Sequence, residues 1–150
     1  IAHQIVRHRS FAFQEFSQRY ANPEAMGDMF VLREARLQDN KNRQNSIIIQ
    51  DDSLKEEWNA KQQSVIDKAK EVYDWALEKG IAKEQARVVL PEGNTKTRLY
   101  MNGTLRSWIH YIELRAANGT QKEHMDIARA CAEVVAKIFP LANNLIQTEE

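Results

Sequence analysis

The segment Arg7-His8-Arg9-Ser10-Phe11-Ala12-Phe13-Gln14-Glu15-Phe16-Ser17-Gln18-Arg19 gathers three arginines, a histidine, a carboxylate and two hydroxyls into one short run. In an extended strand, Arg7 and Arg9 would lie on one side and His8 on the other, because successive side chains alternate. Two guanidiniums on one buried face repel each other and lose hydration unless an anion lies between them. The run therefore predicts a site for an anionic ligand, and phosphate matches the fork of arginine donors best.

A basic cluster near a terminus is more often a solvated surface or a loose anion patch. The order of residue types favours a specific site here. Arg-His-Arg is followed by seven residues, then by Ser17 and Gln-Arg, without a gap. This segment resembles the signature of flavin-dependent thymidylate synthases, and a single short motif of this kind is a hypothesis that the rest of the chain has to support.

A second polar stretch, residues 102–115, supports the same resemblance. Thr104 can cap a helix that starts near Leu105. At about 100° per residue, Arg106 and His110 share one face of this helix, whereas Arg115 lies nearly opposite Arg106. Alone, His110 would more often be a core or surface histidine bonded to Glu113 or Tyr111. Together with residues 118–124 and the amphipathic segment 121–139, however, the stretch resembles the C-terminal half of the same family, so the resemblance covers essentially the whole chain.

The hydrophobic pattern predicts an α+β fold, in which a mostly antiparallel sheet is flanked by helices, within a single domain over residues 1–150. Asp52 or Ser53 can cap a long helix near 52–79, whose apolar residues recur every three or four positions and which Gly80 terminates. A short helix over 83–88 and two C-terminal helices follow. Strands are expected where β-branched and aromatic residues dominate or alternate with polar ones: residues 1–13, leading into a loop near 14–22, then 30–38 and 96–101.

Composition limits the classes of function. Lys and Arg number 21 and so do Asp and Glu, which gives no net charge and no support for bulk binding to nucleic acid or to a membrane surface. No apolar run reaches the length that spans a bilayer, and we expect a cytoplasmic protein. Cys131, the single cysteine, lies among apolar residues at helical spacing and is interpreted as a core residue. The four histidines show no metal-ligand spacing with carboxylates, so no metal is expected.

The chain begins with Ile1 and not with Met, and it is expected to be part of a longer protein. In the family that it resembles, a further segment precedes the first motif and supplies part of the sheet and some flavin contacts.

The resemblance implies roles for individual residues. The nucleotide dUMP would be held by residues of both motifs and by the arginine of Ala86-Arg87-Val88-Val89-Leu90-Pro91, namely Gln4, Ile5, Val6, Arg7, Glu15, Phe16, Ser17, Gln18, Arg19, Arg87 and Arg115. FAD would contact Arg7, His8, Arg9, Glu15, Thr104, Leu105, Arg106 and His110. Thr104 and His110 stand where other members often have Asn, so these two contacts are expected to differ in detail.

The implied reaction is reductive methylation of dUMP to dTMP, with methylenetetrahydrofolate as carbon donor, FAD as redox carrier and NADPH as reductant, in a homotetramer whose subunits share active sites. Arg115 is the expected catalytic residue, because a guanidinium beside the uracil stabilises negative charge on the ring. Ser17 lacks a nearby base at a spacing that guarantees its activation, so ligand binding is its expected role. The alternatives are a non-catalytic nucleotide- or flavin-binding remnant of the family and, with less support, an RNA-binding module.

Overall fold

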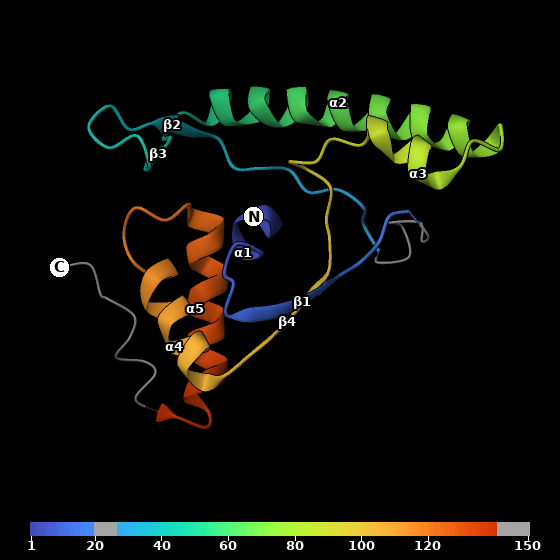
Figure 1. The fold of residues 1–150 in the computed structure, drawn as a ribbon. Helices are drawn as coiled ribbons and strands as arrows, with labels where there is room; N and C mark the ends of the chain where they lie inside the picture. Colours follow the sequence, from blue (N-terminus) through green and yellow to red (C-terminus); the bar gives the residue numbers. More distant parts are fainter. Residues whose placement is uncertain (20–26, 141–150) are drawn as a thin grey trace. The chain divides into compact units, whose positions relative to one another are not determined.

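The computed structural model describes residues 1–19 and 27–140, and it divides the chain into two compact units (Figure 1). The first unit contains residues 1–14, 38–47 and the chain from residue 100 on, and the second contains residues 15–37 and 48–99. The two units are described separately below.

The first unit packs two helices against a short two-stranded ribbon. Strand β1 (Phe11–Glu15) pairs in antiparallel fashion with β4 (Leu99–Gly103), and the last residue of β1 and the first of β4 already belong to the second unit. Helix α4 (Leu105–Arg115) follows β4 directly, and the amide of Ser107 donates to the Thr104 hydroxyl at 3.2 Å, which caps the helix as predicted. Helix α5 (Lys122–Ala136) lies beside α4 (Figure 1). Together they enclose the core formed by Phe11, Tyr111, Ile112, Ala116, Ala128 and Ala132.

Gly103 is required for the packing of this core. A Cβ atom at Gly103 would lie 2.5 Å from Cδ1 and 2.7 Å from Cε1 of Phe11, inside van der Waals contact. Phe11 in turn packs edge-on against Trp108, with ring centroids 5.0 Å apart. We therefore expect Gly103→Ala to displace the ring and to lower the free energy of unfolding by about 1–3 kcal/mol. Urea denaturation measures the effect, with Gly93→Ala as the control, because a Cβ at Gly93 meets nothing within 4 Å. Equal stability of the two variants would contradict this account.

The predicted strand over the first residues is wrong. Residues Ala2–Ile5 form the short helix α1, whose turn is closed by bonds from the amides of Gln4 and Ile5 to the carbonyl of Ile1 at 2.8 and 3.1 Å. The β-branched residues here favour a strand only weakly, and one helical turn satisfies the backbone locally while it buries Ile5. From this helical turn, Gln4 Nε2 donates to Oε1 of Gln121, the residue that precedes α5, at 2.8 Å.

The second unit is built on the predicted long helix. Helix α2 (Asp52–Glu78) begins at Asp51, whose carboxylate accepts a bond from the amide of Leu54 at 3.1 Å, so the cap lies one residue before the predicted position. It ends at Gly80, whose φ of 76° is a left-handed conformation that glycine adopts without strain. Helix α3 (Lys83–Ala86) and a 3₁₀ turn (Arg87–Val89) pack beside it (Figure 1), which confirms the predicted short helix.

Gln62 fastens two loop segments to the buried face of α2. Its Oε1 accepts from the amide of Arg33 at 2.8 Å and from Nδ2 of Asn94 at 3.0 Å, while its Nε2 donates to the carbonyl of Arg33 at 2.9 Å. Both ends of the buried amide are therefore satisfied. This arrangement positions the turn that precedes Arg98 and β4.

The strands are shorter than predicted and form two separate ribbons. In the segment 30–38, only β2 (Arg36–Gln38) is a strand, and it pairs with β3 (Ser46–Ile48) across a polar loop. Phe30 forms a single antiparallel bridge with Thr95. The α+β class is confirmed, but the expected sheet is reduced to two small ribbons, because the loose alternation in 30–38 does not extend over a whole strand.

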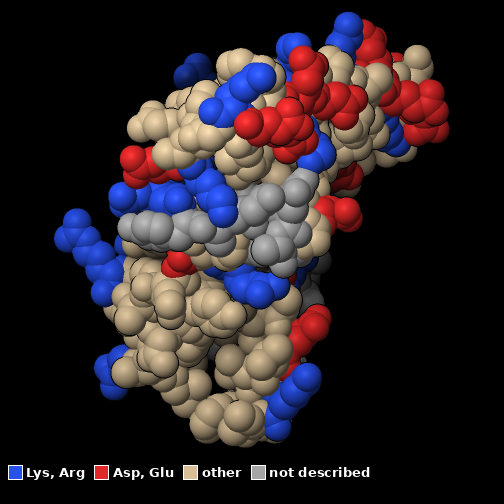
Figure 2. All heavy atoms as spheres, turned by 90° about the vertical axis from the view of Figure 1, so that its right-hand side faces the viewer, with Lys and Arg blue, Asp and Glu red and all other residues tan. Residues whose placement is uncertain are grey.

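Acidic and basic side chains are interspersed in the upper part of the view in Figure 2. On α2, Lys55, Lys68 and Lys70 each pair with a carboxylate three or four residues away. Such pairs stabilise a solvated helix modestly. Among the helices of the described residues, none has the length and apolar character that crossing a membrane requires.

Candidate functional site

The Arg-His-Arg turn, residues 7–9, connects α1 to β1. The amide of His8 donates to the carbonyl of Ile5 at 3.0 Å, and the amide of Phe11 donates to the carbonyl of His8 at 3.2 Å. The prediction that Arg7 and Arg9 share one face of a strand is therefore wrong, because the three residues lie in turns. Both arginine side chains are exposed, whereas His8 is half-buried.

Arg115 is held by His8 within the first unit. Its Nε–H donates to His8 Nε2 at 3.0 Å. Because arginine can only donate, His8 Nε2 carries no proton, and a neutral ring has its proton on Nδ1. Burial, followed by the positive charges of Arg115 and His110, lowers the pKa of His8 and favours this neutral form. The terminal amino groups of Arg115 form no hydrogen bond to other described residues and remain available for a ligand.

The buried imidazole of His124, on α5, links Gln4 to Tyr111 on α4. His124 is fully buried, and its Nδ1 lies 3.0 Å from Gln4 Oε1 while its Nε2 lies 3.1 Å from the hydroxyl of Tyr111. Burial, with a contribution from the charge of Arg115, lowers the pKa of His124 to about 4. The ring of Tyr111 lies edge-on against His8, with centroids 5.0 Å apart, so the two histidines that bond to Arg115 and Gln4 both pack against one tyrosine.

Apart from Glu15, which belongs to the second unit, the residues expected to contact flavin lie on two neighbouring segments of the first unit. The hydroxyl of Ser107 donates to the carbonyl of Ser10 at 3.3 Å, which ties the end of the Arg-His-Arg turn to the first turn of α4. Arg7, Arg9 and Arg106 are exposed, and within residues 1–19 and 27–140 none of them forms an ion pair. Three unpaired guanidiniums beside a helix N-terminus suit a diphosphate, so these residues fit an FAD cofactor.

Two other expected flavin contacts are constrained differently. The Thr104 hydroxyl caps α4 and lies 3.0 Å from the hydroxyl of Ser107, so little of its bonding capacity remains. His110 is exposed and forms no hydrogen bond to the described residues, which leaves both ring nitrogens available and argues against the alternative of a bonded histidine. Leu105 follows the cap and is also exposed.

The second unit contains the other half of the first motif. Glu15 Oε1 accepts from the Thr97 hydroxyl at 2.8 Å, and the amide of Phe16 donates to the carbonyl of Arg98 at 2.8 Å. Ser17 and Gln18 follow and are half-buried. In the described part of the chain, no histidine bonds to Ser17, which agrees with a binding role and not a nucleophilic one.

Two of the predicted nucleotide-binding arginines meet at one residue. Arg19 Nη2 lies 3.5 Å from the carboxylate of Glu84, and Arg87 Nε donates to the backbone carbonyl of Glu84 at 3.4 Å. Arg19 and Glu84 are exposed, so the energy of their ion pair is small. A phosphate can therefore compete with Glu84 for the guanidiniums of Arg19 and Arg87. The second unit thus brings together Arg19 and Arg87, which lie 68 positions apart in the sequence.

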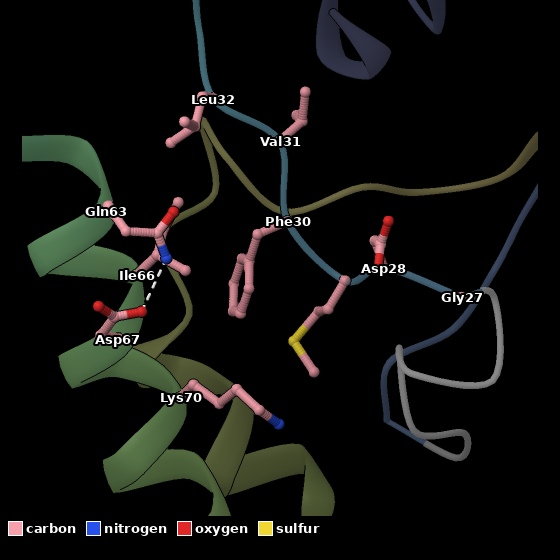
Figure 3. Close-up of a pocket in the computed structure, with 10 residues that line it drawn as sticks. Gly27, Asp28, Phe30, Val31, Leu32, Gln63, Ile66, Asp67 and Lys70 are labelled. Carbon is pink, nitrogen blue, oxygen red and sulfur yellow. Dashed lines mark hydrogen bonds between the residues drawn. The ribbon is translucent and has the colours of Figure 1, made fainter. Parts of the chain in front are cut away.

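A cavity of the second unit lies elsewhere. It has a volume of about 490 Å³ and opens between α2 and the segment 27–32, as Figure 3 shows. Phe30 and Ile66 line it, and Asp67, which accepts from Gln63 Nε2 at 2.7 Å, lies at its edge. None of the predicted site residues lines this cavity.

His124 was not among the predicted binding residues. A sequence signal for it exists, because His124, Ala128 and Ala132 recur every four residues on the buried face of α5. A titratable residue on such an apolar face requires a polar partner. The partner Gln4 lies 120 positions away, so the pattern alone could not identify it.

Comparisons with known proteins identify relatives of this chain. The model of the family described as "Thymidylate synthase complementing protein" matches residues 1–141. The chain is 52% identical over 140 residues to the probable flavin-dependent thymidylate synthase of Paramecium bursaria Chlorella virus 1, and equally so to the flavin-dependent thymidylate synthase of Synechocystis sp.. Each alignment covers 93% of this chain and 63% of the relative, so the chain spans less than two thirds of their length.

A solved structure is also similar. It is a UMP/dUMP methylase, PolB, from Streptomyces cacaoi, bound with 5-Br dUMP, and it matches with a TM-score of 0.79 and 26% identity over 96% of this chain and 65% of that one. The family match, the relatives and this structure agree with the two motifs. The chain belongs to the family of flavin-dependent thymidylate synthases.

Proposed function

We propose that this chain forms the principal part of an enzyme that methylates dUMP reductively to dTMP. Methylenetetrahydrofolate would supply the carbon, and NADPH the hydride that brings this carbon to the methyl level. The observation that carries the proposal is the linkage of Arg115 and Gln4 to Tyr111 through His8 and His124, at the Arg-His-Arg turn, in a member of this family.

The nucleotide would be recognised by charge at one end and by hydrogen bonds at the other. Arg19 and Arg87 would bind its phosphate as bidentate donors. Glu15 and the segment from Phe16 to Gln18 would border the nucleotide. Arg115, already oriented through Nε by His8, would direct its terminal amino groups to the uracil and stabilise negative charge that develops on the ring.

The flavin would be FAD, held through its diphosphate by Arg7, Arg9 and Arg106. Bound FAD supplies the hydride chemistry that amino-acid side chains lack. The protein contributes position and charge: the turn that carries Arg7 and Arg9 is tied to α4 by the bond from Ser107 to Ser10. Arg115 and Arg106 lie on opposite sides of α4, and we propose that a homotetramer uses both sides by sharing each site between subunits.

The complete protein tests this proposal directly. We expect purified protein to bind FAD, to lose the visible flavin absorption with NADPH and to regain it when dUMP and methylenetetrahydrofolate are added, with dTMP as the product. Size-exclusion chromatography with light scattering measures the oligomer. Binding of dUMP and FAD without dTMP formation would instead support a non-catalytic member of the family.

Ser17→Ala provides a narrower test. If Ser17 binds the nucleotide, its loss removes one hydrogen bond and we expect kcat/KM to fall by about tenfold, with turnover retained. If Ser17 were a nucleophile, turnover would be abolished. Steady-state kinetics with varied dUMP distinguish the two roles, and Ser64→Ala on the exposed surface of α2 is the control.

A further inference from the structure

The hydrogen bonds around His124 form one chain with a single direction. Gln4 Oε1 can only accept, so His124 Nδ1, 3.0 Å away, must donate to it. A neutral His124 then accepts at Nε2 from the hydroxyl of Tyr111 at 3.1 Å. Burial that lowers the pKa of His124 keeps the ring neutral. The proton positions of Tyr111 and His124 and the orientation of the Gln4 amide are thereby linked.

The chain continues beyond Gln4 in the same sense. Gln4 Nε2 donates to Gln121 Oε1 at 2.8 Å, and Gln121 Nε2 donates to the carboxylate of Glu123 at 2.8 Å. An ionised carboxylate only accepts, so it fixes the direction of the whole series, and the tyrosine hydroxyl, which can donate or accept, takes the donor role at the other end. Reversal of the Gln4 amide would place donor against donor at His124 and acceptor against acceptor at Gln121.

This direction of the hydrogen bonds leaves one N–H group of Gln4 Nε2 available as a donor. Nε2 carries two hydrogens, of which one bonds to Gln121, and no other described residue accepts the second. Oε1 is engaged by His124. Gln4 is half-buried, so a ligand beside it meets an N–H group and not an oxygen.

We propose that His124 is a positioning residue that locks the Gln4 amide as a donor to O4 of the pyrimidine and so selects uracil over cytosine. This inference rests on the proposed function, in which Gln4 contacts the nucleotide. The two bases share O2 and differ at N3 and at position 4: uracil has a donor N–H and an acceptor oxygen there, and cytosine has an acceptor nitrogen and a donor amino group. A fixed N–H group favours uracil only at position 4, because at N3 it would favour cytosine, whereas an amide that can turn accommodates both bases.

The test compares the affinities of dUMP and dCMP for the complete protein by isothermal titration calorimetry. In His124→Leu, the Gln4 amide loses the donor at Oε1 and is held only through Nε2 by Gln121, and we expect the preference for dUMP over dCMP to fall by about tenfold or more, the value of one hydrogen bond. Purely structural damage would weaken both nucleotides equally. An unchanged ratio, or a variant that binds dUMP as before and still rejects dCMP, would overturn the proposal.

Two milder variants keep the test valid if His124→Leu does not fold. Tyr111→Phe removes only a hydroxyl, which frees His124 to exchange its tautomer, and we expect a smaller loss of preference in the same direction. His124→Gln offers an amide N–H to Gln4 and an oxygen to Tyr111, and should retain more of the preference than leucine does. The opposite order of these variants would contradict the assigned direction.

A measurement without ligand separates this inference from the proposed function. In ¹⁵N-labelled protein, His124 should show a protonated Nδ1 and an unprotonated Nε2, unchanged from pH 6 to 8. The opposite tautomer would overturn the proposed polarity, even if dUMP binds. Failure of the wild-type protein to bind any pyrimidine nucleotide would instead count against the proposed function.

Discussion

Arg115→Ala should reduce turnover by about three orders of magnitude or more, which corresponds to about 4 kcal/mol of transition-state stabilisation. The guanidinium is half-buried and held by His8, so its charge acts at a fixed position and with little screening by water. Arginine cannot serve as a base, so its contribution is electrostatic. Single-turnover kinetics with saturating dUMP measure this loss apart from weaker binding of the substrate.

The conservative variant Arg115→Lys and a control variant at a distant arginine complete this experiment. Lysine keeps the charge but lacks the planar fork that bonds to His8 and to a ligand together, so we expect an intermediate rate. Arg43 lies exposed in the loop between β2 and β3, and Arg43→Ala should leave turnover unchanged. Near-normal turnover in Arg115→Ala would remove Arg115 from its assigned role.

The helices could be predicted well because their signals are local. The three- to four-residue spacing over 52–79 and the capping hydroxyl of Thr104 are visible in the sequence, and both elements are confirmed. The segment at residues 1–6 was predicted wrongly because its β-branched residues favour a strand, while the single helical turn depends on the burial of Ile5. The strand at 96–101 begins three residues later than expected, since the amide of Lys96 instead bonds to the carbonyl of Met29.

The residue types that form the site could be predicted from the sequence, but their spatial arrangement only in part. The motif indicated an anion site with Arg7 and Arg9, but it could not show that His8 accepts from Arg115, because that bond joins residues 107 positions apart. The opposite placement of Arg106 and Arg115 followed from helical geometry, and their burial agrees with it, since Arg106 is exposed and Arg115 half-buried. The spacing on α5 indicates that His124 is buried, but its bond to Gln4 is a tertiary contact that this local pattern cannot show.

The stability of the protein should fall between about pH 6.5 and pH 4 because His124 is buried in its neutral form. Its pKa is about 4 in the folded state, against 6.5 for an ordinary histidine. Between these values the unfolded chain binds a proton that the folded chain does not, so acidification favours unfolding. Above pH 6.5 both states are neutral and the effect is absent. The full difference is on the order of 3 kcal/mol and is complete once the pH falls below the folded-state pKa.

His124→Gln isolates this contribution, since glutamine does not titrate. We expect the free energy of unfolding, measured by urea denaturation from pH 7.5 to 4, to fall less steeply in the variant than in the wild type, whatever their stabilities at pH 7.5. The carboxylates titrate in both proteins and cancel from the comparison. His8, whose pKa is also lowered, gives both proteins a residual slope of the same sign. Parallel curves would mean that His124 takes up its proton without disturbing the fold, which its burial against Tyr111 and its bond to Gln4 argue against.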